Sequence, residues 1–275
     1  MKTYRYRKHI RWMKFVIPAF LVMLAACFIL PLFVSRRVDA EFDSVLIGLN
    51  VFILIEAWVI WRIFDRLSRV EVSLNEEGIA YHGKKGLVEI PFEEITEIKH
   101  PSVRYLGGWL KVRAGAKDIR LTVVLEGIGD FVGELKSSLD RLGFSDRYQR
   151  AKLFRFYKTA EYGDQSWARV YEFFWKLMMW MALSGVVGAL IGYFHVEGRN
   201  RSLAVTFWAL GSLVWCLVAY MFSEMMLARR FARQANEAEF AVPARDPEVE
   251  RRVFTRAIRI AAPLYVVIAA LIFLL

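Results

Sequence analysis

The most unusual chemical group in this sequence is a carboxylate inside an apolar stretch. Glu56 lies within residues 44–64, which are long enough to cross a membrane as a helix. An ionised acid is costly there and often serves the movement of protons or cations. Asn50 precedes it by six residues on the same predicted helix, so the two side chains do not share one face closely. Either Glu56 belongs to a transport pathway, or it is protonated or paired with a polar group in a helix bundle.

Other patterns that carry chemistry are missing from the sequence. It has no glycine-rich phosphate loop, Cys-x-x-Cys, His-Glu-x-x-His or Gly-x-Ser-x-Gly. The four histidines are scattered, and both cysteines lie in apolar runs, where cysteine is usually a small buried hydrophobe. We therefore expect no enzymatic activity, no metal site and no cofactor.

A basic strip with one aromatic residue is predicted on two neighbouring strands. Apolar residues occupy alternate positions there, so the residues between them face outward together. The strip consists of Trp109, Lys111, Arg113 and Arg120. It could hold an anionic lipid headgroup or the acidic surface of another copy, and a solvated sheet face is the alternative. Nucleic acid is not expected, because one aromatic residue offers little stacking.

Small residues recur every four positions in a later apolar run. These residues are Ser184, Gly188 and Gly192. Small side chains at this spacing let two helix backbones approach closely in lipid. The pattern predicts a helix contact, either within the chain or between two copies.

The strip belongs to the one long segment that reads as a water-soluble domain, residues 69–142. Alternating apolar residues predict short strands at about 70–74, 79–81, 87–91, 95–98, 109–113 and 119–123. From Gly127 onward the apolar residues fall on one helical face, and Gly143 follows where a helix end often has glycine. The segment is therefore expected to form several strands followed by one amphipathic helix.

This segment resembles the pleckstrin-homology-like domain of bacterial membrane proteins. The resemblance rests on the strand order, Gly-Ile-x-Tyr at 78–81, Ile-Pro-Phe-Glu-Glu-Ile-Thr-Glu-Ile at 90–98, and the terminal amphipathic helix. It implies a small bent β-barrel or sandwich capped by a C-terminal helix. The implied role is binding or scaffolding rather than chemistry.

The remaining chain has the composition of a membrane protein. Hydrophobic residues make up 56% of the 275 residues and aromatic residues 15%. The apolar runs predict about five transmembrane helices, at about 15–34, 44–64, 177–194, 203–223 and 257–275. The last run is short, so four crossings are the alternative. A cleaved signal peptide is a second reading of the first run, but that run is too long and Arg36 and Arg37 follow it.

The net charge of +10 comes from the flanks of these runs. Residues 69–142 contain eleven Lys and Arg against twelve Asp and Glu. Lys and Arg number 6, 3, 7 and 8 in the segments 1–14, 62–69, 143–176 and 224–259, and only 2 each in the loops 35–44 and 195–202. Cytoplasmic loops carry the basic excess, so the N-terminus and residues 69–142 are expected inside and the C-terminus outside.

The sequence thus predicts an α+β protein of the inner (plasma) membrane with four parts. They are a basic segment with two spans (1–68), a cytoplasmic pleckstrin-homology-like domain (69–142), a basic connecting or interfacial helical segment (143–176), and three spans with a cytoplasmic loop at 224–256 (177–275). The expected role is a non-enzymatic scaffold or regulator that binds membrane lipids, a protein partner or another copy. A small transporter or channel subunit that uses Glu56 is the alternative.

Overall fold

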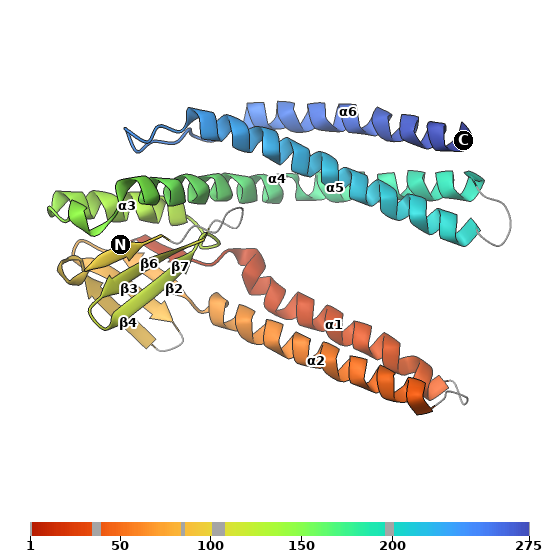
Figure 1. Ribbon diagram of the computed structural model, residues 1–275, viewed down its shortest axis with the longest axis horizontal. Helices are drawn as coiled ribbons and strands as arrows, with labels where there is room; N and C mark the ends of the chain where they lie inside the picture. Colours follow the sequence, from red (N-terminus) through yellow and green to blue (C-terminus); the bar gives the residue numbers. More distant parts are fainter. Residues whose placement is uncertain (1, 35–39, 84–85, 101–107, 196–200, 275) are drawn as a thin grey trace. The chain divides into compact units, whose positions relative to one another are not determined.

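The structure, a computed structural model, describes residues 2–34, 40–83, 86–100, 108–195 and 201–274. The fold is α+β, with two small antiparallel sheets and long helices (Figure 1). The chain divides into two compact units, Met1–Ala160 and Glu161–Leu275. The first contains both sheets, and the second contains helices.

The first sheet has the strand order β1-β2-β3-β4, and every neighbouring pair is antiparallel. Its strands are β1 (Lys2–Arg5), β2 (Glu71–Leu74), β3 (Gly78–Gly83) and β4 (Gly86–Pro91). Strand β1 comes from the segment that the sequence assigned only to a basic flank. It pairs with β2 from Lys2↔Leu74 to Arg5↔Glu71. The N-terminus therefore belongs to the sheet domain.

The second sheet contains β5 (Glu97–Lys99), β6 (Trp109–Ala114) and β7 (Lys117–Thr122), again all antiparallel. A short 3-10 helix, Phe92–Glu94, precedes it, so the predicted strand at 95–98 begins two residues later than expected. Among the described residues the two sheets remain separate. Of the barrel or sandwich that the resemblance implies, a closed barrel is thus not formed by them.

Helix α3 (Ile128–Arg141) fills the core of the sheet domain. Its fully buried apolar side chains are five residues on one face, Ile128, Phe131, Val132, Leu135 and Leu139. They join buried strand residues that include Leu110, Val112, Ile119 and Leu121. Lys2 of β1 also forms exposed ion pairs with Asp130 and Glu134 of α3, at 2.9 and 3.2 Å. Burial of large apolar side chains is the main stabilising contribution here.

Two long helices, α1 (Lys8–Val34) and α2 (Ala40–Ser68), form a hairpin between β1 and β2 (Figure 1). Because β1 pairs with β2, both open ends of the hairpin start at the same sheet. Lys14 and Asp65 lie 3.6 Å apart across these ends. From the sequence, the sheet domain was expected as an insertion between the second and third spans. The structure shows that the hairpin is inserted into the sheet.

The later helices are α4 (Arg150–His195), α5 (Arg201–Gln234) and α6 (Pro247–Leu274). The predicted connecting segment and third span form one continuous helix, α4. The first turns of α4 belong to the sheet domain, where Phe154 and Phe156 are buried. These aromatic rings therefore do not lie open for lipid headgroups, as an interfacial helix would require.

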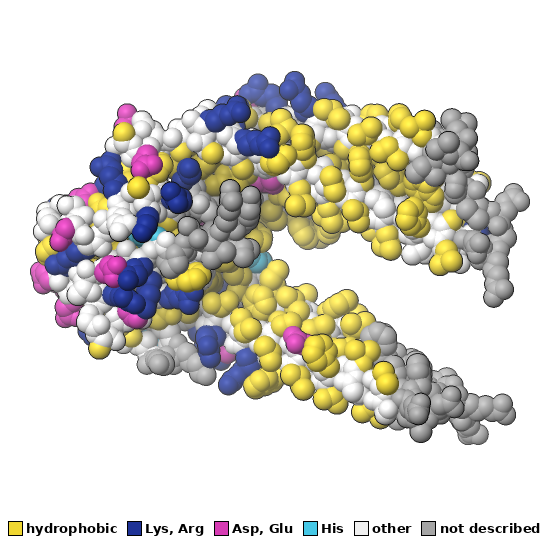
Figure 2. All heavy atoms as spheres, in the orientation of Figure 1, with side chains coloured by type: hydrophobic (Ala, Val, Ile, Leu, Met, Phe, Trp, Pro, Cys, Tyr) yellow, Lys and Arg dark blue, Asp and Glu magenta, His cyan; other side chains and the backbone are white. Residues whose placement is uncertain are grey.

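Four helices in the described part of the chain are long and apolar enough to cross a membrane. They are Lys8–Ala26, Ile47–Ser68, Arg150–Phe194 and Arg201–Gln234. Figure 2 shows hydrophobic side chains over the surfaces of the long helices. The fifth predicted span, in α6, does not meet the same criterion within the described residues, so five spans are not confirmed.

Candidate functional site

The four residues of the predicted strip lie on one face of the β5–β6–β7 sheet. Along β6 half-buried and buried residues alternate, and Trp109, Lys111 and Arg113 are the half-buried ones. Lys111 pairs in register with Arg120 of β7. The alternation of the pleat therefore brings the strip together as expected.

Two carboxylates share this face and neutralise part of the strip. Asp118 of β7 lies opposite Arg113 in register, and Glu97 of β5 lies on the other side of Arg113. Lys111 Nζ is 2.6 Å from Asp118, whereas Arg113 is 3.6 Å from Glu97 and 3.8 Å from Asp118. Asp118 lies two residues before Arg120, so the same alternation along β7 points it outward. Its place on this face could therefore have been predicted from the sequence. The face is of mixed charge.

Arg120 is the most available cation on this face. Its guanidinium group lies 3.7 Å from the centre of the Trp109 ring. Such stacking holds the guanidinium plane in place and leaves its N–H edges free to donate hydrogen bonds. Among the residues that the structure describes, no carboxylate forms an ion pair with Arg120. It is thus preordered to receive an acidic group.

The ion pairs of Lys111 and Arg113 are only weakly stabilising. Their side chains are 26% and 41% exposed, and the exposed fraction of Asp118 is 46%. Ion pairs of this kind contribute about 0–1 kcal/mol, because water screens them. A partner with its own carboxylates can therefore replace Glu97 and Asp118 at little cost.

A buried histidine follows β5 at the edge of this sheet. His100 is 8% exposed, and its ring lies 5.8 Å from the Phe156 ring. No described residue forms a hydrogen bond with either ring nitrogen. Burial, with a smaller contribution from the positive charge of Lys152, lowers the pKa of His100 to about 4. The imidazole is therefore neutral at pH 7. Residues 101–107 lie outside the described part of the chain.

Glu56 and Asn50 lie on different sides of α2. Asn50 is buried, together with Ile53 and Ala57 at helical spacing, whereas Glu56 is exposed on the hairpin surface. This agrees with the expectation that the two residues do not share a face. The described residues of the hairpin do not bring them into one polar site.

The small residues of α4 pack against α5. A side chain added at Gly188 would lie 2.4 Å from the carbonyl oxygen of Trp208, and one at Gly192 would lie 2.5 Å from that of Ala204. Ser184 Oγ is 3.1 Å from Cys216 Sγ. Of the two alternatives left by the sequence, the structure thus contains the contact within the chain.

The second unit contains a buried ionic cluster that sequence reasoning missed. We call it the Arg169 cluster; its charged members are Arg169, Glu172, Glu224, Arg245 and Glu250. Arg169 donates to both oxygens of Glu224 at 2.8 and 2.7 Å, and to Glu250 at 2.7 Å. Arg245 connects Glu250 to Glu172, at 2.8 and 2.6 Å. The cluster joins α4, α5 and the start of α6.

Hydroxyl groups complete the Arg169 cluster. Tyr162, Ser166 and Tyr220 donate to the Glu224 carboxylate at 2.8, 3.1 and 3.2 Å. The side chains of Arg169 and Glu250 are only 4% and 5% exposed. Every charged side chain of the cluster therefore contacts one of opposite charge. The Glu224 carboxylate accepts five hydrogen bonds. The sequence showed Glu224 at the end of an apolar run, but its partner is 55 residues away on another helix. No spacing rule connects them.

Among the described residues no group of three or more His, Cys, Asp or Glu side chains is placed to hold a metal ion. The chain matches no protein-family model, no curated protein and no solved structure. Its function must therefore be argued from its own geometry.

Proposed function

We propose that this chain is a non-enzymatic integral membrane protein that presents its sheet domain to a protein partner. The observation that carries the proposal is the mixed-charge face of β5, β6 and β7, with Arg120 stacked on Trp109. Arginine and tryptophan are enriched among the residues that dominate protein–protein binding energy. The alternating charges favour a partner of complementary pattern over a uniformly anionic surface.

Four apolar helices support the membrane part of the proposal. The pairing of β1 with β2 supports two crossings by the α1–α2 hairpin, because its two ends return to one sheet. The basic excess at the open ends of the helices supports a cytoplasmic location of the sheet domain. In this arrangement the domain stays at the membrane surface, where tethering raises its effective concentration and weak contacts suffice.

The likeness to a pleckstrin-homology-like domain is part of the same proposal. Two antiparallel sheets followed by α3 support it. Strand β1 of that domain would then come from the segment that precedes the α1–α2 hairpin. Binding and scaffolding are the roles that this likeness implies.

Site-specific photo-crosslinking in native membranes tests the sheet face. A photoreactive residue is placed at Lys99, which pairs with Lys111 in register on this face, or at the exposed Leu87 of the other sheet. We expect a discrete protein adduct from position 99 and none from position 87. The pair of substitutions Arg113→Ala and Arg120→Ala should lower the adduct yield by roughly tenfold or more, since the partner's acids lose their counter-charges.

Lys117→Ala is the matched control for this experiment. Lys117 is a basic residue of β7, the strand that carries Arg120. It contacts Glu94 and the Glu89 carbonyl, which lie beside the face. Its removal should leave the adduct unchanged. Equal adducts from positions 99 and 87, or a position-99 adduct that survives the double substitution, would contradict the proposal.

A further inference from the structure

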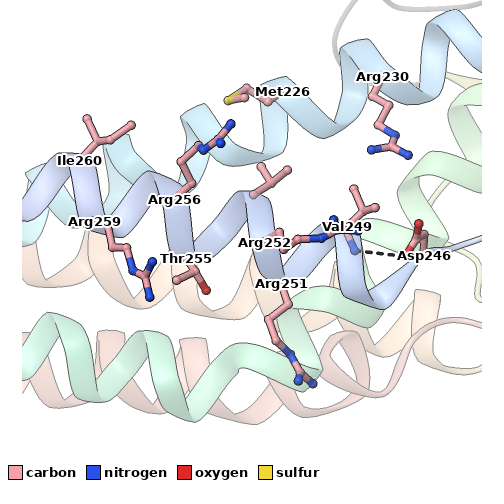
Figure 3. A pocket seen from close by; sticks show the side chains of 11 residues that line it. Met226, Arg230, Asp246, Val249, Arg251, Arg252, Thr255, Arg256, Arg259 and Ile260 are labelled. Carbon is pink, nitrogen blue, oxygen red and sulfur yellow. Dashed lines mark hydrogen bonds between the residues drawn. The ribbon is translucent and has the colours of Figure 1, made fainter.

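A groove rich in arginine lies between α5 and α6 in the second unit. It has a volume of about 920 Å³. Its five basic residues are Arg230, Arg251, Arg252, Arg256 and Arg259. Figure 3 shows Arg230 and Met226 on α5 and the other four arginines along α6. At a rise of about 1.5 Å per residue, the arginines of α6 extend over roughly 12 Å.

The described carboxylates leave these guanidinium groups without ion-pair partners. Within the described part of the chain, none of the five forms an ion pair with a carboxylate, and all five residues are exposed. Among the described residues that line the groove Asp246 is the one acid, and it accepts a hydrogen bond from the Val249 backbone at 3.1 Å at the start of α6 (Figure 3). With five arginines against one acid, the groove carries a concentrated excess of positive charge.

Clustered arginines without acids are suited to phosphate. The planar guanidinium group donates two parallel hydrogen bonds to phosphate oxygens, and it keeps its charge at any physiological pH. Five such groups, four of them along about 12 Å of α6, exceed what one singly charged phosphodiester can neutralise. The chemistry fits a ligand with at least two negative charges on phosphate.

The apolar side of the groove distinguishes a lipid from a soluble phosphate. Met226 and Ile260 line the groove and are 38% and 61% exposed. Beyond Ile260 the exposed residues of α6 are apolar, with Leu264, Val267 and Leu271 on its surface. A headgroup held by the arginines would thus have its acyl chains beside an apolar helix surface, where such chains gain free energy.

We propose that this groove binds the headgroup of an anionic phospholipid that carries two phosphates. The inference rests on the membrane location in the proposed function, and it adds a ligand site that is independent of the sheet face. Arg252, Arg256 and Arg259 recur at helical spacing and form the main row of donors. Arg230 approaches from α5. Basic pockets between membrane helices bind such headgroups through these contacts.

Lipid binding by the full-length protein in nanodiscs tests the proposal. The discs contain phosphatidylcholine with a fluorescent cardiolipin, a lipid with two phosphates, or with phosphatidylglycerol, which has one. We expect saturable binding that favours cardiolipin. Arg256→Gln with Arg259→Gln should weaken it by roughly tenfold or more. Arg229→Gln with Arg233→Gln removes equal charge from exposed positions of α5 that do not line the groove, and should change binding less than twofold.

A second experiment distinguishes a lipid phosphate from a soluble phosphate. Inorganic pyrophosphate is added to the detergent-solubilised protein, and thermal stabilisation is compared with that given by cardiolipin. Stabilisation by cardiolipin alone supports the lipid. Equal stabilisation by pyrophosphate, or equal loss of binding in both double variants, would overturn the proposal. A chain that alkaline carbonate extracts from membranes would instead overturn the membrane location, and the crosslinking from position 99 tests the sheet face separately.

Discussion

Two groups of arginines in the second unit differ in their ion pairing and in their exposure to water. In the Arg169 cluster, Arg169 and Arg245 contact three carboxylates, and the side chain of Arg169 is only 4% exposed. In the arginine groove, five guanidinium groups are exposed and no described carboxylate forms an ion pair with them. The two groups lie close along α6, since Glu250 belongs to one and Arg251 to the other.

The difference separates a structural role from a binding role. A buried ion pair contributes little by its presence, but removal of one partner leaves an uncompensated charge in a dry environment. An exposed arginine without a partner contributes little to stability and is available for an external anion. The Arg169 cluster should therefore control folding of the second unit, and the groove should control what the unit binds.

Arg169→Met gives the largest effect that we expect. Glu224 and Glu250 would lose their shared donor, and the free energy of unfolding should fall by about 3–5 kcal/mol. Titration of the unfolding in mixed micelles with sodium dodecyl sulfate measures it. Adding Glu224→Gln to the same chain should recover part of the loss, because it removes the stranded charge.

Arg256→Met in the groove is the matched comparison for Arg169→Met. It removes an arginine that is exposed and lacks a described carboxylate partner, so the free energy of unfolding should change by less than about 0.5 kcal/mol. Similar losses for both substitutions would remove the distinction between the two arginine groups.

Gly188→Ala tests the close approach of α4 and α5, the helices that carry Arg169 and Glu224. The new methyl group would meet backbone atoms of Trp208 at 2.4 and 2.9 Å, so the two helices must separate. We expect a loss of about 2–3 kcal/mol in the same unfolding assay. Gly211→Ala on α5 has nothing within 4 Å and should be neutral or stabilising by up to about 1 kcal/mol. A larger loss at Gly211 than at Gly188 would contradict this packing.

His100 extends the comparison to a buried group without a charged partner. Its pKa of about 4 lies below the unfolded value of 6.5, so the unfolded chain binds more protons between these values. Stability is therefore present above pH 6.5 and is lost as the pH falls toward 4. At pH 5 the loss relative to pH 8 should be about 2 kcal/mol.

The His100 contribution is measured as the difference between the native protein and two variants. His100→Gln and His100→Leu both lack the titrating group, so both should lose this part of the pH dependence in detergent unfolding at pH 8 and pH 5. Leu should also be more stable than Gln at pH 8, because a buried amide without partners is costly. A pH dependence that persists in both variants would assign it to other groups.

The sheet domain was predicted from sequence because its signal is local. Alternating apolar residues gave β6 within one residue of its ends and β7 within two, and the strip residues share a face because parity along each of the two strands places them there. Strand β1 was missed because Tyr4 is the one buried residue among its four, which leaves no alternating apolar pattern. Its partner β2 lies beyond the whole hairpin, so only three-dimensional pairing reveals it.

The charged sites, too, could be predicted from the sequence only in part. The sequence displayed the basic excess near 224–259, but it did not separate paired from unpaired arginines. Arg245 and Arg251 lie six residues apart, yet one is joined to two carboxylates and the other lines an open groove. Which carboxylates are within reach depends on the positions of α4 and α5.

By itself the sequence determined the apolar helices, the strands and the placement of positive charge, because hydrophobicity and strand parity are properties of neighbouring residues. The tertiary structure decided that the N-terminus completes a sheet, that Asp118 and Glu97 neutralise part of the strip, and that Arg169 is enclosed while the α6 arginines stay open. Coulomb interactions and desolvation depend on distances of a few ångströms between distant segments. Those distances exist only after the helices have packed.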